Sequence, residues 1–139
     1  MDKEFFKQII GIFQMESEEH VQTMKKGLAD LSSASSEDQQ QEILETIHRA
    51  AHSLKGAART VGLSDVEPIC QSIESAFSQF KREKVVVPPD VLDLFERAVN
   101  ELGGMLSTLN TEGKIEGDKG GLMHMIEEIN DKLASISSE

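Results

Sequence analysis

The sequence has no tryptophan, no tyrosine and only one cysteine, Cys70, among its 139 residues. A lone cysteine excludes an internal disulfide, so an apolar core must hold the fold together. No stretch approaches the roughly 20 continuous apolar residues that cross a bilayer, and no apolar run with basic flanks resembles a signal peptide. We therefore expect a cytoplasmic protein with no membrane partner.

Positive charge is also scarce, because 14 lysines and arginines face 25 aspartates and glutamates, for a net charge of -11. Nucleic acids and anionic membranes attract basic surfaces, so neither is an expected partner. Proline is rare as well, with three residues, whereas alanine, leucine, glutamate, glutamine and lysine are common. This composition favours helices, and the length suits one domain, so we expect a single all-α domain over residues 1–139.

Apolar residues recur at steps of three and four over several long segments, which is the period of a helix that buries one face. The expected helices span residues 3–31, 37–60, 65–82, 89–110 and, as a further C-terminal stretch, 120–136. Short connections between the first four helices favour an antiparallel four-helix bundle, to which the fifth helix is an addition.

Cap residues mark the ends of two of these helices. Ser36 followed by Gln39 predicts a capping box that starts the second helix, and Ser64 followed by Glu67 predicts another at the start of the third. Gly62 supplies a stop signal for the second helix, because glycine readily adopts the left-handed conformation that ends helices.

The stretch AHSLKGAARTVGL, residues 51–63, places a histidine on the polar face of the second helix. At about 100° per residue, the apolar side chains of this helix fall within an arc roughly 120° wide. They are Ile43, Ile47, Ala50, Ala51, Leu54, Ala57, Ala58 and Val61. His52 lies about 160° from the middle of that arc, so we expect it to face water.

Four further residues share the outer face with His52: His48, Lys55, Gly56 and Arg59. The two cations follow His52 by three and seven positions and could hold an anion over its ring. Gly56 costs the helix about 1 kcal/mol relative to alanine, but it leaves space beside the histidine. The pattern predicts a histidine that handles an anion, with His48, Gly56 and Arg59 on a partner-binding face.

The motif HSLKGAARTVGL resembles the phospho-acceptor helix of histidine-containing phosphotransfer (HPt) domains, most of all the N-terminal domain of CheA-type chemotaxis histidine kinases. The order of helices is similar over nearly the whole chain. The resemblance implies that His52 accepts a phosphoryl group from the ATP-binding domain of a histidine kinase and passes it to an aspartate of a response regulator receiver domain. It also implies that Lys55 neutralises phosphate charge and that Gly56 lets the partner approach.

The same resemblance implies that the partner domains supply ATP and Mg²⁺. This chain would then bind no cofactor and would be no enzyme on its own, although it could be the N-terminal part of a CheA-type kinase. No glycine-rich phosphate loop follows a strand in the sequence, which agrees with this expectation.

In the family, a glutamate from the next helix orients the imidazole, and the matching position is Glu74 in SIESAF. Its helical angle independently places Glu74 about 100° from the centre of the third helix's apolar arc, where it could reach a neighbouring helix. A carboxylate that accepts Nδ1–H would leave the Nε2 lone pair of His52 free as the nucleophile. The alternative is a solvated surface carboxylate.

The sequence departs from the family pattern at three positions. Gln71 stands where a second histidine often precedes the glutamate, Ala57 replaces a second glycine, and Arg59 occupies a position where a small residue is common. None of these changes removes the acceptor, the lysine or the glycine.

Two other classes of function remain open. A helical interaction module could use the same face without any phosphoryl transfer. His48 and His52 could share a metal at i and i+4, but no third ligand has a suitable spacing, so no metal site is expected.

Two further groups of residues receive structural interpretations. His20 and His124 lack the cation and glycine neighbours of His52, so we expect ordinary surface roles for them. The methionines are expected to fill the core; they are Met15, Met24, Met105, Met123 and Met125.

Overall fold

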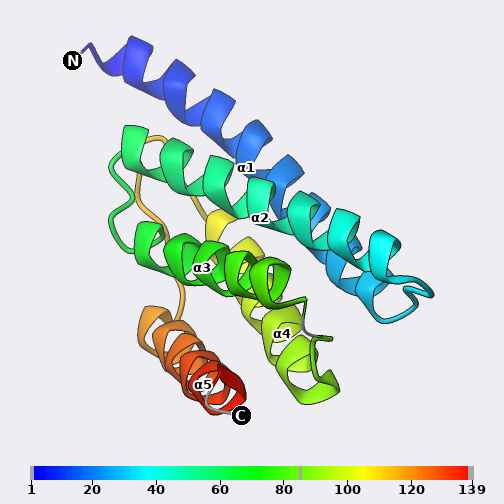
Figure 1. Cartoon of the computed structure of the whole chain (residues 1–139). Helices are drawn as coiled ribbons and strands as arrows, with labels where there is room; N and C mark the ends of the chain where they lie inside the picture. The colour runs from blue at the N-terminus through cyan, green and yellow to red at the C-terminus, as the bar shows by residue number, and fades with distance from the viewer. Residues whose placement is uncertain (1, 85, 138–139) are drawn as a thin grey trace.

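The computed structural model describes residues 2–84 and 86–137, and this part of the chain forms five α-helices and no strand (Figure 1). The helices are α1 (Lys3–Leu31), α2 (Glu37–Thr60), α3 (Glu67–Glu83), α4 (Pro89–Leu106) and α5 (Lys119–Ser137). The all-α class and the bundle with an added C-terminal helix are therefore confirmed. The bounds of α1 and α2 agree with the sequence prediction, and those of α5 differ by one residue at each end.

Helix α2 lies between two neighbours, because it packs against both α1 and α3 (Figure 1). Helix α4 packs against α1, and α5 lies along α4 and α3 on the side away from α2. This arrangement leaves the polar face of α2 uncovered and brings a face of α3 directly beside it.

The start of α2 follows the predicted cap only in part. The Ser36 hydroxyl accepts the backbone N–H of Gln39 at 3.1 Å, as a capping box requires. The Gln39 side chain, however, accepts from the backbone and hydroxyl of Ser35 and not from Ser36. The side chain of Gln39 therefore accepts the backbone N–H of Ser35, one residue earlier than the predicted capping box requires.

The end of α2 matches the predicted glycine stop. Gly62 has a φ of +79°, and its N–H donates to the carbonyl of Arg59. The N–H of Leu63 donates to the carbonyl of Ala58 at 2.9 Å, which completes a Schellman motif. The buried Leu63 side chain then anchors the short connection that turns the chain back into α3.

The predicted capping box at the start of α3 is wrong. The helix begins at Glu67, with Val66 in the cap position and no side-chain hydrogen bond there. The Glu67 carboxylate accepts instead from the Arg59 guanidinium on α2, at 2.8 Å from Nε. A contact between helices has replaced the local contact with Ser64 that the sequence suggested.

The predicted end of α4 at residue 110 is also wrong, because the helix stops at Leu106. Leu109 continues the apolar spacing and is buried, but it lies in the following connection. Its carbonyl accepts a hydrogen bond from the Gln14 side chain at 2.9 Å. The apolar period therefore extended past the helix because the loop itself packs on the core.

Three phenylalanines join α3 to α4 within the core. Phe77 lies 4.9 Å from Phe95 and 5.6 Å from Phe80, measured between ring centroids. All three rings are almost fully buried. Such aromatic pairs stabilise the fold beyond the area they bury, and here they fix the helix that carries Glu74.

Helix α5 is attached through an apolar face and two ion pairs. The Nζ atom of Lys119 lies 3.0 Å from Oδ2 of Asp65 before α3, and Nζ of Lys132 lies 3.0 Å from Oδ2 of Asp90 at the start of α4. The buried residues of α5 are Leu122, Ile126, Ile129 and Leu133. No helix among the described residues is long and apolar enough to cross a membrane.

The methionine prediction holds for four residues but not for Met15 on α1. Met24 and Met105 are buried, and Met123 and Met125 pack partly buried against the core. Met15 is 69% exposed, so its interpretation as core filler is wrong. It lies on the side of α1 that no other helix covers.

Candidate functional site

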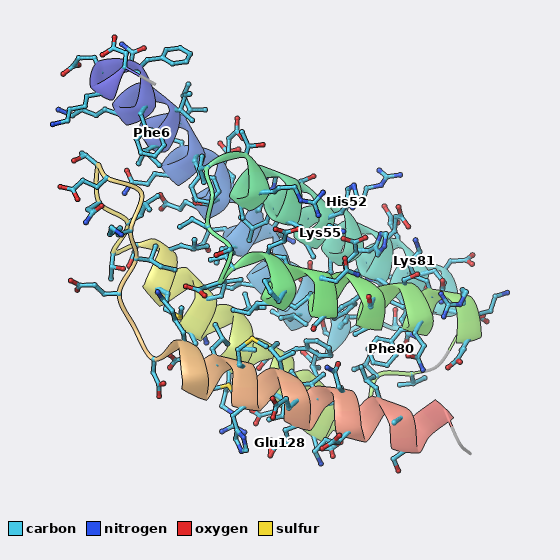
Figure 2. The ribbon with its side chains drawn as sticks, turned by 90° about the vertical axis from the view of Figure 1, so that its left-hand side faces the viewer. Phe6, His52, Lys55, Phe80, Lys81 and Glu128 are labelled. Carbon is cyan, nitrogen blue, oxygen red and sulfur yellow. The ribbon has the colours of Figure 1, made fainter. Side chains whose placement is uncertain are left out.

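His52 projects outward from the middle of α2, where α2 and α3 run side by side (Figure 2). Its side chain is 65% exposed, which confirms the prediction that it faces water. The apolar residues on the opposite face of the helix, such as Ala51 and Leu54, are fully buried. Burial of this face therefore fixes the direction in which the imidazole projects.

Glu74 on α3 is the partner of the imidazole. The Glu74 Oε2 atom lies 3.2 Å from Nδ1 of His52, although the Glu74 side chain is only 16% exposed. The alternative of a solvated surface carboxylate is therefore wrong. The position at the edge of the apolar arc brings the carboxylate across to α2, as its helical angle predicted.

Lys55 lies closer to α3 than the sequence suggested. Its Nζ atom lies 2.8 Å from the same Oε2 of Glu74, and its side chain is only 14% exposed. The expected placement of Lys55 on the open outer face is wrong, because its long side chain leans into the seam between the helices. One carboxylate oxygen thus has two basic neighbours, the ammonium and the imidazole.

Gln71 extends this network along α3. Its Oε1 accepts from Lys55 Nζ at 2.9 Å, and its Nε2 donates to the hydroxyl of Ser75 at 2.8 Å. The sequence marked Gln71 only as a departure from the family pattern. The structure shows that this amide is a second partner of the Lys55 ammonium, besides Glu74.

Charge and burial act in opposite directions on Glu74. Burial by itself would raise the pKa of the carboxyl group, but the contacts with Lys55 and then His52 outweigh it and lower the pKa below its ordinary value. The two contacts with Oε2 are ion-pair distances, 2.8 Å from Lys55 Nζ and 3.2 Å from His52 Nδ1. Glu74 is therefore held ionised beside the ring.

Gly56 leaves the other flank of His52 open. It is exposed, and a Cβ atom built on it would meet no atom within 4 Å. This placement agrees with the predicted outward direction. Nothing in the packing of α2 therefore requires a glycine at this position, and its role in partner approach stays a prediction.

The other two predicted partner-binding residues are less free. The Arg59 guanidinium contacts the Glu67 carboxylate through both Nε and one terminal nitrogen. His48 is half-buried one turn before His52. The partner-binding roles of both residues stay predictions.

Helix α1 contributes residues that the sequence did not connect with the site. A shallow hollow between α1 and α2 is lined by Glu16, Glu19 and His20 from α1 and by His52, Ser53 and Gly56 from α2. His20 was expected to have an ordinary surface role. No signal within one helix could reveal this grouping, because it depends on how α1 packs on α2.

Two other chemistries find no support among the described residues. No group of three or more histidine, cysteine, aspartate or glutamate side chains there is placed to hold a metal ion. The Cys70 thiol is buried, and its apolar surroundings, followed by the nearby charge of Glu74, raise its pKa to about 12. Cys70 is therefore a core residue and not a nucleophile.

Residues 8–111 match the Hpt domain family. The chain is 29% identical over 102 residues to the chemotaxis protein CheA of Bacillus subtilis, a match that covers 73% of this chain and 15% of the relative. It is 23% identical over 121 residues to CheA of Halobacterium salinarum, covering 87% of this chain and 18% of the relative. The chain thus spans less than a fifth of the length of these relatives.

A solved structure shows the same fold. It is the phosphorylated P1 domain of CheA3 in complex with CheY6 from R. sphaeroides, with a TM-score of 0.79 and 19% identity, covering 93% of this chain and 98% of that one. The family match extends over most of the sequence and includes the motif around His52. The chain therefore belongs to the Hpt domain family, the family of histidine-containing phosphotransfer domains.

Proposed function

We propose that this chain is a phosphoryl carrier in chemotaxis or related two-component signalling. His52 accepts a phosphoryl group from the ATP-binding domain of a histidine kinase and passes it to an aspartate of a receiver domain. The observation that carries this proposal is an exposed imidazole whose Nδ1 lies 3.2 Å from a largely buried carboxylate of the next helix. The chain is a carrier and substrate, and it is no enzyme on its own.

In this proposal each ring nitrogen has its own role, and the contact of Nδ1 with Glu74 supports it. With its proton on Nδ1, facing Glu74, the neutral ring keeps the lone pair of Nε2 for attack. Nε2 forms a bond to the γ-phosphorus of ATP as the bond from that phosphorus to the bridging oxygen breaks and ADP leaves. The ring then carries positive charge, which the Glu74 carboxylate offsets at Nδ1.

The second transfer reverses the roles at the same nitrogen. A carboxylate oxygen of the receiver attacks the phosphorus, the bond from phosphorus to Nε2 breaks, and the neutral ring is restored. Both steps depend on positioning and on neutralising phosphoryl charge, so the partner domains would supply Mg²⁺ and the pockets for ATP and the acidic residues.

Lys55 acts through Glu74 in this proposal. Its ammonium lies 2.8 Å from Glu74 and donates to Gln71, so it is already occupied before any phosphate arrives. It would hold the carboxylate ionised and in place for His52. Its contribution to phosphate charge is then the long-range effect of a cation in the seam between α2 and α3.

The relatives suggest the partners. The similar P1 domain was solved in complex with CheY6, and the curated relatives are CheA proteins many times longer than the matched segment. We propose by analogy that this chain forms one domain, works in the cytoplasm with a CheA-type kinase, within the same polypeptide or beside it, and docks a receiver domain over Gly56, with His48 and Arg59 at the edges.

Incubation with an active CheA-type kinase domain and labelled ATP tests the proposal. We expect label that is stable to alkali and labile to acid, as phosphohistidine is, and no label on His52→Gln. An absence of label with several kinases would overturn the proposal and favour an interaction module without phosphoryl transfer.

A further inference from the structure

The hollow between α1 and α2 adjoins the acceptor on the side away from Glu74. Its α1 wall consists of Glu16, Glu19 and His20, and its α2 wall includes His52, Ser53 and Gly56. Because α1 and α2 pack against each other, the helix backbones place these α1 residues beside the part of α2 that carries His52. None of these α1 residues has a part in the function proposed above.

The orientation of the imidazole directs Nε2 toward this side. The two ring nitrogens lie on opposite sides of the ring, and Nδ1 is directed at Glu74 on α3. Nε2 is therefore directed away from Glu74. His52 and Gly56 both line the hollow, and a Cβ atom on Gly56 would meet nothing within 4 Å, so the hollow has room for a phosphoryl group on the imidazole.

The charges around the hollow single out one residue. Glu16 and Glu19 would repel a phosphoryl group, and Ser53 is neutral. The cations of α2 are engaged elsewhere, since Lys55 contacts Glu74 and the Arg59 guanidinium contacts Glu67. Among the described residues that line the α1 wall, His20 is the one that can carry positive charge.

We infer that His20 is a positioning residue for the phosphorylated state: its imidazolium donates an N–H to a phosphoryl oxygen on Nε2 of His52. Glu16 and Glu19 line the same wall of the hollow as His20. Only the protonated ring carries positive charge, so the proposed contact requires His20 in its imidazolium form. The inference rests on the proposed function, because it requires phosphate on His52.

A titration of the individual histidines by NMR tests this inference. Phosphoramidate, a small-molecule phosphoryl donor, can modify exposed histidines without any kinase, and mass spectrometry identifies protein that carries one phosphate on His52. We expect the midpoint of His20 to rise by roughly one pH unit in that species, as beside a doubly negative neighbour. The exposed His124 on α5 is the internal control and should keep its midpoint.

The variant His52→Gln, treated in the same way, should leave the midpoint of His20 unchanged. An unchanged midpoint in the species phosphorylated on His52 would overturn the inference, because a merely structural His20 would not sense the phosphate. The kinase assay keeps the two proposals apart. Label from the kinase with no response of His20 removes only this inference, whereas a response of His20 without label from any kinase removes the proposed function.

Discussion

The two flanks of His52 differ in almost every physical respect. On the α3 side, Glu74 and Lys55 are mostly buried, close together and held by Gln71. On the α1 side, Gly56 has no atom near the position of a Cβ, and the surface is an open hollow. One flank fixes the imidazole, and the other leaves room for the group that approaches it.

The two flanks affect stability in different ways. Burial alone would raise the pKa of the Glu74 carboxyl group, but the contacts with Lys55 and His52 outweigh burial, so the ionised carboxylate contributes to the free energy of unfolding. Gly56 costs α2 about 1 kcal/mol of helix propensity relative to alanine and makes no packing contact in return. The proposed function predicts that the closed flank directs the ring and that the open flank gives partners access, so substitutions on the two flanks should have different effects.

The largest effect should come from the acceptor between the flanks. His52→Gln should abolish labelling by the kinase, because glutamine has no imidazole nitrogen to bind the phosphoryl group. It should keep the helical circular dichroism, because the side chain of His52 is exposed. His124→Gln, at an exposed histidine of α5, is the control and should label normally. Label that survives on His52→Gln would place the acceptor elsewhere.

Substitutions on the closed flank should slow phosphorylation without unfolding the bundle. We expect Glu74→Ala to lower the rate by about 10- to 100-fold, the range for partners that orient a reactive imidazole. Lys55→Met should lower it in the same direction by acting through Glu74. In a double-mutant cycle, the double variant should lose far less rate than the product of the two single fold-changes, because both residues act through the same carboxylate. Full additivity would mean that Lys55 acts on the phosphate directly.

Substitutions on the open flank should separate stability from transfer. Gly56→Gln should stay folded and lose transfer to and from partners by about tenfold or more through steric exclusion, while its reaction with phosphoramidate changes little. Gly56→Ala should melt at the same or a higher temperature, since alanine stabilises the helix by up to about 1 kcal/mol. Normal transfer by Gly56→Gln would contradict the assignment of this flank to partner approach.

The smallest effect concerns the pH dependence of folding. The pKa of Glu74 is lowered in the folded protein, so its contribution to the free energy of unfolding is present above its ordinary value of 4.5 and is lost as the pH falls through the folded value. Wild type should exceed Glu74→Gln by about 1 kcal/mol or less at pH 7, and the difference should shrink toward pH 3 in denaturant titrations.

Glu128→Gln is the control for this measurement, because Glu128 is exposed on α5, far from the seam (Figure 2). This control shows how much pH dependence comes from replacing any surface glutamate by glutamine. A wild-type advantage over Glu74→Gln that grows toward low pH would contradict the direction of the Glu74 pKa shift.

The sequence predicted those features that depend on one helix at a time. The period of apolar residues gave the bounds of α1 and α2 and the outward direction of His52, because each follows from 100° steps around a single axis. Gly62 was found because its left-handed conformation depends on local backbone sterics. Glu74 was found from the family resemblance, with its helical angle as support.

Features that depend on contacts between elements were missed. Lys55 has a long, flexible side chain, so the angle of its Cα atom does not decide whether the ammonium reaches water or α3. Glu67 was predicted to cap α3, but Arg59 takes its carboxylate from across the helix pair. The hollow with His20 requires the packing of α1 on α2, which no periodicity encodes.

The central claim is that phosphate bonds to Nε2 of His52 while Nδ1 faces Glu74. NMR of the kinase-phosphorylated domain with ¹⁵N-labelled histidine tests it directly, because coupling to ³¹P identifies the bonded nitrogen. We predict coupling to Nε2 of His52 alone, with the proton kept on Nδ1. Coupling to Nδ1, or to a nitrogen of another histidine, would contradict the account.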